Sequence, residues 1–153
     1  MFTVRCIPPR NRKEYLHLLL LADPDETMLE RYLSAGDMYL GLKDEQIVCE
    51  AVILPLSSDT CELKNLATEP GRQRHGYARR LVDRLSQIYA ERGFRTMLVG
   101  TSITGTSFYP KLGFSPSHIV ENFFTDNYAE PVLDNGILCI HMYYFQKALH
   151  KLE

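Results

Sequence analysis

The sequence predicts a mixed α/β (α+β) fold, in which one domain over residues 1–153 forms a central mixed, mostly antiparallel sheet flanked by helices. Three observations support this prediction. A chain of 153 residues suits a single hydrophobic core. Patterns in which apolar and polar residues alternate, as in strands, occur in both halves of the chain. A stretch with apolar residues three or four positions apart, as in a helix, lies between two of these strand patterns.

The first half of the chain predicts a strand, two helices and a hairpin. Phe2 to Ile7 alternates between apolar and polar residues, which is typical of a strand. Asn11 can cap a first helix, with Glu14 as its capping-box partner. Asp23 begins the Asp-Pro-Asp-Glu run that opens a second helix. The strands of the following hairpin are Met38 to Leu42 and Gln46 to Leu56.

The second half of the chain predicts the remaining strands and the longest helix. That helix runs from Tyr77 to Arg92, and Gly93 is its natural C-terminal stop. A further short helix is expected from Thr104 to Leu112. The expected strands are Cys61 to Thr68, Thr96 to Gly100, Phe114 to Phe124 and Ile137 to Phe145.

Composition excludes several classes of protein. The chain is 45% hydrophobic and 24% charged, which is typical of a soluble globular protein, and no apolar run is long enough to span a membrane. The N-terminus lacks a signal-peptide layout, so we expect a cytoplasmic protein. The four cysteines are scattered, which predicts reduced thiols, and no metal-ligand spacing occurs. These cysteines are Cys6, Cys49, Cys61 and Cys139.

The turn from Gln73 to Ala78 is the strongest functional signal. It connects a predicted strand to the N-terminus of the longest helix, where free backbone N–H groups and the helix dipole favour a phosphate. It lacks the sequence of a P-loop or of a dinucleotide fingerprint, and it could also be a plain connection. Arginines cluster around it, yet the net charge of −2 argues against a nucleic-acid partner. A small phosphorylated ligand fits better.

Two motifs together resemble the GCN5-related N-acetyltransferase (GNAT) family. The pattern Gln/Arg-x-x-Gly-x-Gly/Ala at Gln73 to Ala78 is similar to the family's acyl-CoA signature. The segment Phe108 to Phe114 is similar to its Tyr-x-Lys-x-Gly-Phe segment. The resemblance covers almost the whole chain and implies the GNAT acyl-CoA N-acyltransferase fold. It also implies transfer of an acetyl group from acetyl-CoA, as cosubstrate, to an amine acceptor.

The resemblance assigns expected roles to individual residues. Glu62 aligns with the family's general base and Tyr109 with the acid that protonates the CoA thiolate, although either could be structural instead. Glu62 is expected to face a cleft and water, because a carboxylate at the centre of a strand is costly to bury. Lys64 would share the face of Glu62 and weaken it as a base. The residues expected to bind the cofactor are Leu66, Ala67, Thr68, Arg72, Gln73, Arg74, His75, Gly76, Tyr77, Ala78 and Arg79.

Some points stay open at this level. Thr101 and Ser102 stand where many family members carry an asparagine near the thioester arm. The segment from Glu121 to Gly136 either shapes the acceptor pocket or an oligomer interface, such as that of a homodimer, or is a solvated loop. Asp23, Asp25, Glu26 and Glu30 lie on the expected first helix pair, which borders the acceptor cleft in the family, so an acidic rim there could favour a cationic amine. Asp23 to Glu26 is also ordinary helix N-terminal chemistry, and we prefer that interpretation. A non-catalytic acyl-CoA-binding protein and a nucleic-acid-binding module are the rival functions.

Overall fold

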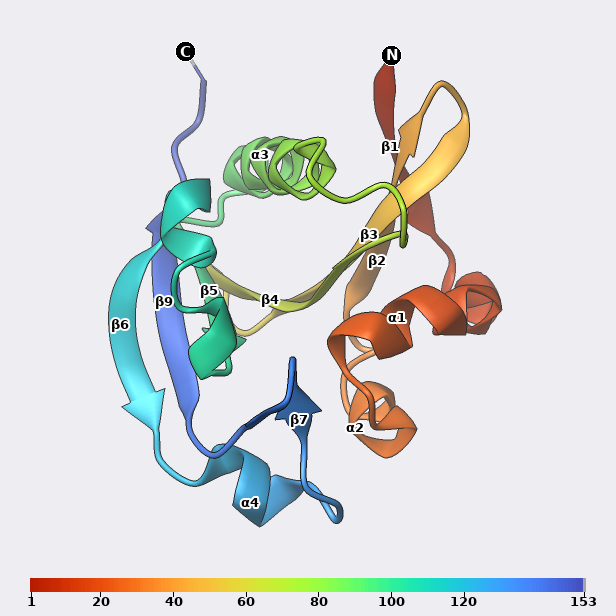
Figure 1. Cartoon of the computed structure of the whole chain (residues 1–153). Helices are drawn as coiled ribbons and strands as arrows, with labels where there is room; N and C mark the ends of the chain where they lie inside the picture. The colour runs from red at the N-terminus through yellow and green to blue at the C-terminus, as the bar shows by residue number, and fades with distance from the viewer. Residues whose placement is uncertain (153) are drawn as a thin grey trace.

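Seven strands form one continuous sheet in the computed structural model, which describes residues 1–152. Their order is β1-β2-β3-β4-β5-β9-β6, and all neighbours are antiparallel except β4 and β5. The predicted mixed, mostly antiparallel sheet is therefore confirmed (Figure 1). The strands are β1 (Phe2–Ile7), β2 (Asp37–Lys43), β3 (Gln46–Pro55), β4 (Thr60–Thr68), β5 (Thr96–Thr101), β6 (Ser115–Val120) and β9 (Met142–Ala148).

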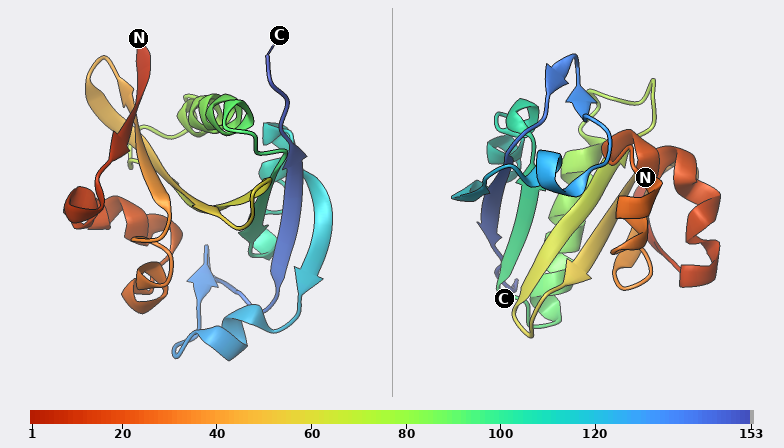
Figure 2. Two further views of the ribbon diagram at one scale, coloured as in Figure 1. Left: turned by 180° about the vertical axis from the view of Figure 1, so that it is seen from behind. Right: turned by 90° about the horizontal axis from the view of Figure 1, so that it is seen from below.

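Helices cover both faces of this sheet. Helix α3 (Tyr77–Glu91) lies across one face, and α1 (Leu16–Ala22) with α2 (Glu26–Glu30) lies on the other (Figures 1 and 2). The core is accordingly divided in two by the sheet, because successive strand residues point to opposite faces. Leu81 and Leu85 of α3 belong to one buried cluster, and Leu19 and Leu29 belong to the other.

Strands β4 and β5 separate after a short paired stretch. Only Thr60 to Leu63 of β4 pair with β5, whereas β4 remains paired with β3 as far as Thr68. The register with β3 shifts at Lys64, so that Val52 lies opposite Asn65 but Ile53 lies opposite Leu63. This extra residue is a β-bulge, which bends the strand and changes the alternation of its side chains. The second half of β4 thus has no β5 partner beside it.

The segment between β6 and β9 crosses the opening on the α1 side. It contains α4 (Phe123–Asn127) and a small hairpin of β7 (Leu133–Asp134) and β8 (Ile137–Leu138). Figures 1 and 2 show this segment reaching from the β9 side toward α1 and α2. The Arg31 guanidinium donates a hydrogen bond of 3.4 Å to the Asn127 side chain. The stretch from Glu121 to Gly136 therefore contacts the opposite side of the domain, although most of its residues are exposed.

Two predicted helices differ from the structure. Asn11 does not cap a helix: it lies inside the 3-10 helix η1 (Pro9–Tyr15), and its side chain donates to Glu14 at 2.7 Å. Pro9 favours the start of a helix, so η1 begins about one turn earlier in the chain than a helix capped by Asn11 would begin. Two 3-10 helices, η2 (Ile103–Gly105) and η3 (Tyr109–Leu112), replace the single helix that was expected from Thr104.

The last strand predictions were also too long. The strand expected from Phe114 to Phe124 ends at Val120, because Asn122 adopts a left-handed conformation with φ of 57° and α4 follows. The stretch expected from Ile137 to Phe145 is divided into β8 and β9. Helix α3 ends one residue before the predicted Arg92, and Gly93 follows with φ of 97°, as a C-terminal stop requires.

Arg12 fixes the position of the α1 face, and its loss should destabilise the protein. Its buried guanidinium donates to the carbonyls of Ile7, Leu33 and Gly36, the last at 2.6 Å. Replacing Arg12 with Met leaves these acceptors without a charged donor, so the free energy of unfolding should fall by about 2–4 kcal/mol. Urea denaturation measures the change, and the exposed Arg10→Met is the control with an expected effect within about 0.5 kcal/mol. Equal stability of the two variants would contradict this role.

Candidate active site

Two cavities of about 500 Å³ each adjoin where β4 leaves β5. The turn cavity lies between the Gln73–Ala78 turn and the end of β4. The sheet cavity lies between β4, the end of β5, the loop after α1 and the segment that contains β7. Leu21, Leu66 and Phe108 line both cavities, so the two spaces meet at these residues. Together they form one elongated site through the sheet.

The predicted cofactor residues gather in the turn cavity. Its predicted lining residues are Leu66, Ala67, Thr68, Arg72, Gln73, Arg74, Gly76, Tyr77, Ala78 and Arg79. His75 is not among them, because its ring stacks on Tyr77 at 5.5 Å and its Nδ1 faces the Arg72 and Gln73 carbonyls. His75 thus contacts the turn itself, whereas the other predicted residues surround the cavity.

The N-terminus of α3 leaves its backbone donors free. Gly76 is the N-cap, with φ of 76°, and among the described residues no side chain caps this helix and no acidic residue lies in its first turn. In α2, by contrast, the Asp25 carboxylate accepts hydrogen bonds from the first N–H groups. Arg79 and Arg80 lie near the positive end of the α3 dipole, where basic side chains are unfavourable unless an anion binds. The turn is therefore built to receive an anion.

Asp23 lies on the wall of the sheet cavity. The helix N-terminal chemistry expected for Asp23 to Glu26 is confirmed at Asp25, which caps α2, and at Glu26 in the first turn, whereas Asp23 itself does not cap the helix. The Asp23 carboxylate accepts hydrogen bonds from Tyr32 Oη at 3.2 Å and Tyr128 Oη at 3.0 Å. The Asp25 backbone N–H donates a third, at 3.3 Å. Burial raises the pKa of Asp23 above its ordinary value, and these donors oppose that rise.

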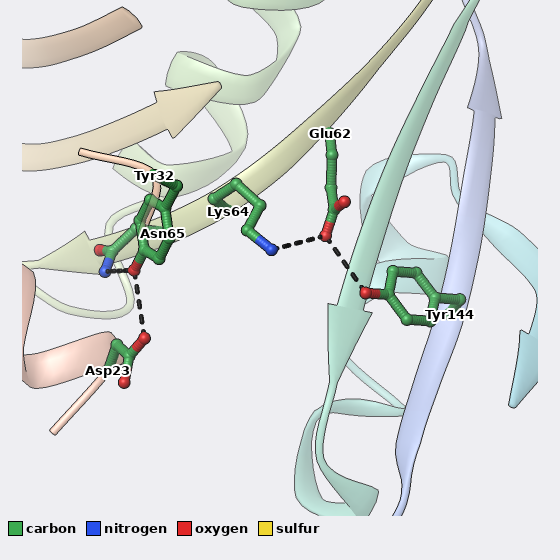
Figure 3. Close-up of polar contacts among 6 residues, drawn as sticks. All are labelled: Asp23, Tyr32, Glu62, Lys64, Asn65 and Tyr144. Carbon is green, nitrogen blue, oxygen red and sulfur yellow. Dashed lines mark hydrogen bonds and ion pairs between the residues drawn. The ribbon is translucent and has the colours of Figure 1, made fainter. Parts of the chain in front are cut away.

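Glu62 and Lys64 face the same side of β4, as predicted. Lys64 Nζ lies 3.3 Å from Glu62 Oε2, and the Tyr144 hydroxyl donates to the same oxygen at 3.4 Å (Figure 3). Glu62 was expected to face water, but only 8% of it is exposed. Lys64 lines the sheet cavity, whereas Glu62 does not. Burial and the Glu62 charge raise the pKa of Tyr144 to about 12, and its hydroxyl therefore stays protonated.

Tyr144 reaches Glu62 across β5 because the residue between them is small. It was interpreted as an ordinary strand residue, and it does belong to β9. Gly100 of β5 pairs with Tyr144, and a Cβ atom on Gly100 would lie 3.0 Å from the tyrosine ring and 2.8 Å from Met142 Sδ. Such a contact is too close for any larger residue. A glycine within a strand, here the second-last residue of β5, is the signal in the sequence for this crossing.

Tyr109 packs against the buried cluster that includes Leu81 and Leu85, and it lines the sheet cavity. Its ring packs edge-on against Phe108 at 5.0 Å and Phe114 at 5.8 Å. Burial raises the pKa of Tyr109 to about 12. The phenol therefore remains a hydrogen-bond donor at any physiological pH.

Other site types find no support in residues 1–152. No group of three or more His, Cys, Asp or Glu side chains there could hold a metal ion. Within the same residues, no helix is both long and apolar enough to cross a membrane. The four cysteines are free thiols as predicted, although Cys6 is exposed rather than part of the core.

Comparison with known proteins agrees with this geometry. Residues 34–116 match the model of the acetyltransferase (GNAT) domain. YvbK, an uncharacterised N-acetyltransferase of Bacillus subtilis (strain 168), is 33% identical over 132 residues, which cover 84% of this chain and 85% of YvbK. Two solved structures are also similar over nearly their whole length. One is a GNAT family acetyltransferase from Elizabethkingia anophelis with acetyl-CoA bound (TM-score 0.85, 30% identity, 97% of this chain and 98% of the other). The other is a Bacillus subtilis acetyltransferase in complex with CoA (TM-score 0.86, 29% identity, 97% and 99%).

Proposed function

The chain belongs to the GNAT acetyltransferase family, and on that premise we propose that it transfers the acetyl group of acetyl-CoA to a primary amine by direct attack. The proposal is based on the pair of adjoining cavities. One of them ends at the uncapped N-terminus of α3, where several arginines lie. The acetyl-CoA and CoA bound to two similar structures support the choice of cosubstrate. The acceptor is a small molecule or a protein.

In this proposal the turn cavity holds the cosubstrate. Backbone N–H groups at the start of α3 bind the pyrophosphate, and Arg72, Arg74 and Arg79 add positive charge. The pantetheine arm lies along the second half of β4, which has no β5 neighbour to occupy its backbone groups. Leu66 N–H then faces the thioester oxygen, where negative charge develops during the reaction. Leu66 lines both cavities, which supports this position.

The sheet cavity holds the acceptor. The amine nitrogen attacks the thioester carbonyl and forms the C–N bond of the product amide, while the C–S bond breaks and CoA leaves as a thiolate. Glu62 takes the surplus proton of the amine, and an intervening water carries it, because Glu62 does not itself line the cavity. Tyr109 donates a hydrogen bond or a proton to the departing sulfur from the cavity wall.

An acceptor screen with detection of the free CoA thiol tests the proposal. Release of thiol that depends on an amine, together with an acetylated amine found by mass spectrometry, is the expected result. Binding of acetyl-CoA without turnover across primary amines and protein amines would favour a non-catalytic acyl-CoA-binding protein instead.

Gly76→Asp should prevent CoA binding. Gly76 precedes the first turn of α3, and an aspartate there adds bulk and negative charge where the pyrophosphate is proposed to bind. The rise in melting temperature caused by CoA should disappear. Gly71→Asp is the matched control, because Gly71 also has a left-handed backbone with open space around its Cβ position and does not line the cavity. A full CoA-induced rise in the Gly76 variant would show that the anion site is elsewhere.

Tyr109→Phe should lower kcat and spare CoA affinity. The substitution keeps the ring packed against Phe108 and Phe114 but removes the donor at the sulfur. A loss of about tenfold to a thousandfold in kcat is expected, similar at pH 7 and pH 9. Steady-state rates and, where product release limits turnover, single-turnover rates measure it. Parental single-turnover rates in the variant would leave Tyr109 with a packing role only.

Glu62→Gln should cause a loss of activity that shrinks as pH rises. The amide keeps the shape of the side chain but cannot take a proton, whereas free amine forms without help near the acceptor's own pKa. The ratio of parental to variant kcat/KM should therefore fall between pH 7 and pH 10. Tyr109→Phe is the comparison that should not recover. Parental activity of Glu62→Gln at pH 7 would exclude Glu62 as the base.

A further inference from the structure

Asp23 is a buried carboxylate that faces a cavity without an opposite charge beside it. It is 9% exposed and lies in the connection between α1 and α2. Among residues 1–152, no Lys, Arg or His nitrogen lies within ion-pair distance of it. Lys64 is the one basic residue among those that line the cavity, and it is paired with Glu62. A buried anion of this kind lowers its free energy when a cation binds next to it.

The orientation of this carboxylate is fixed by hydrogen bonds of defined direction. Asn65 Nδ2 donates to Tyr32 Oη at 3.1 Å, which leaves the Tyr32 proton for Asp23 Oδ2 (Figure 3). Tyr128 donates to Oδ1 from the opposite side of the cavity, 105 residues further along the chain. Because Asn65 immediately precedes Leu66, the same chain of bonds ties Asp23 to the proposed thioester position.

We propose that Asp23 is a specificity-determining residue that binds a cationic nitrogen of the acceptor, so that the preferred acceptor is a small diamine. This inference rests on the proposed acetyl transfer. The nitrogen bound by Asp23 is not the one that reacts. A reacting amine must lose its proton, whereas a carboxylate that is fixed by three hydrogen-bond donors stabilises the protonated ammonium ion. One end of the diamine therefore binds to Asp23 while the other, neutral end reaches the thioester.

Acceptors of equal chain length test the charge that the cavity selects. The three acceptors differ at the end away from the reacting amine. That end is a cation in butane-1,4-diamine, a methyl group in butylamine and an anion in 4-aminobutanoate. We expect kcat/KM to be highest for the diamine, lower for the monoamine and lowest for the amino acid. The kcat/KM values of the diamine and the monoamine should differ by at least about tenfold, mainly because their KM values differ. Series of three to six carbons find the best length. Equal kcat/KM for diamine and monoamine at every length would overturn the proposal.

Asp23→Asn identifies the residue responsible. The ratio of diamine to monoamine kcat/KM should fall toward one, because the amide accepts the tyrosine hydrogen bonds but carries no charge. Asp134→Asn is the matched control: Asp134 also lines the cavity, but it is exposed and bonded to Ser102 and Thr104. That variant should keep the parental ratio. An equal loss in both variants would assign the selectivity to the general charge of the cavity and overturn the role of Asp23.

A catalytic or purely structural role of Asp23 would give a different pattern. If Asp23 were the base, the Asp23→Asn variant would lower kcat for diamine and monoamine alike and leave their ratio unchanged, which would also overturn the proposal. Should that variant fail to fold, Tyr128→Phe removes one donor and should raise the diamine KM several-fold more than the monoamine KM.

A binding measurement separates this inference from the proposed function. With CoA present, butane-1,4-diamine should raise the melting temperature of the parent more than butylamine does, and Asp23→Asn should abolish the difference. No difference in the parent would overturn the diamine inference, even if monoamines are acetylated. If no acceptor causes amine-dependent thiol release, the proposed function is refuted instead. The binding result does not test the proposed function.

Discussion

The separation of β4 from β5 is the constraint on which the rest of the site depends. Two parallel strands that stayed paired would close the sheet, and neither cavity could pass through it. Pairing stops after Leu63 and Val99, and the bulge at Lys64 bends β4 away. Both cavities then meet at Leu66. A local change in hydrogen bonding of one strand therefore creates the space for two reactants.

An opening in a sheet has a cost in unsatisfied polar groups, and nearby side chains reduce it. Asn65, which follows the bulge, is 3% exposed and donates to the Leu19 carbonyl and to Tyr32. These bonds attach the displaced part of β4 to α1 and α2.

Glu50 on the neighbouring strand is fully buried, and among the described residues its carboxyl oxygens have no hydrogen-bond partner. Burial raises its pKa well above the ordinary value, so the neutral form is favoured at this position.

The sequence predicted what local chemistry determines. The turn at Gly76, the stop at Gly93 and the hairpin between β2 and β3 all follow from backbone preferences of a few residues, and all were confirmed. Contacts over long separations were missed. Tyr144 reaches Glu62 over 82 residues, and Tyr128 reaches Asp23 over 105. No periodicity carries such information, and the bulge at Lys64 that changes which residues share a face is equally invisible in the alternation of residues.

The arrangement of charge explains why the opening can serve two different ligands. On the α3 side, free backbone donors and arginines at a helix N-terminus favour an anion. On the α1 side, Lys64 is paired with Glu62, and Asp23 contributes a carboxylate that has no cation beside it in the described chain. A polyanionic cosubstrate is attracted to the first cavity, and the proposed cationic acceptor would be attracted to the second. The two cavities share Leu66 and Phe108, so the reacting groups of the two proposed ligands would meet there.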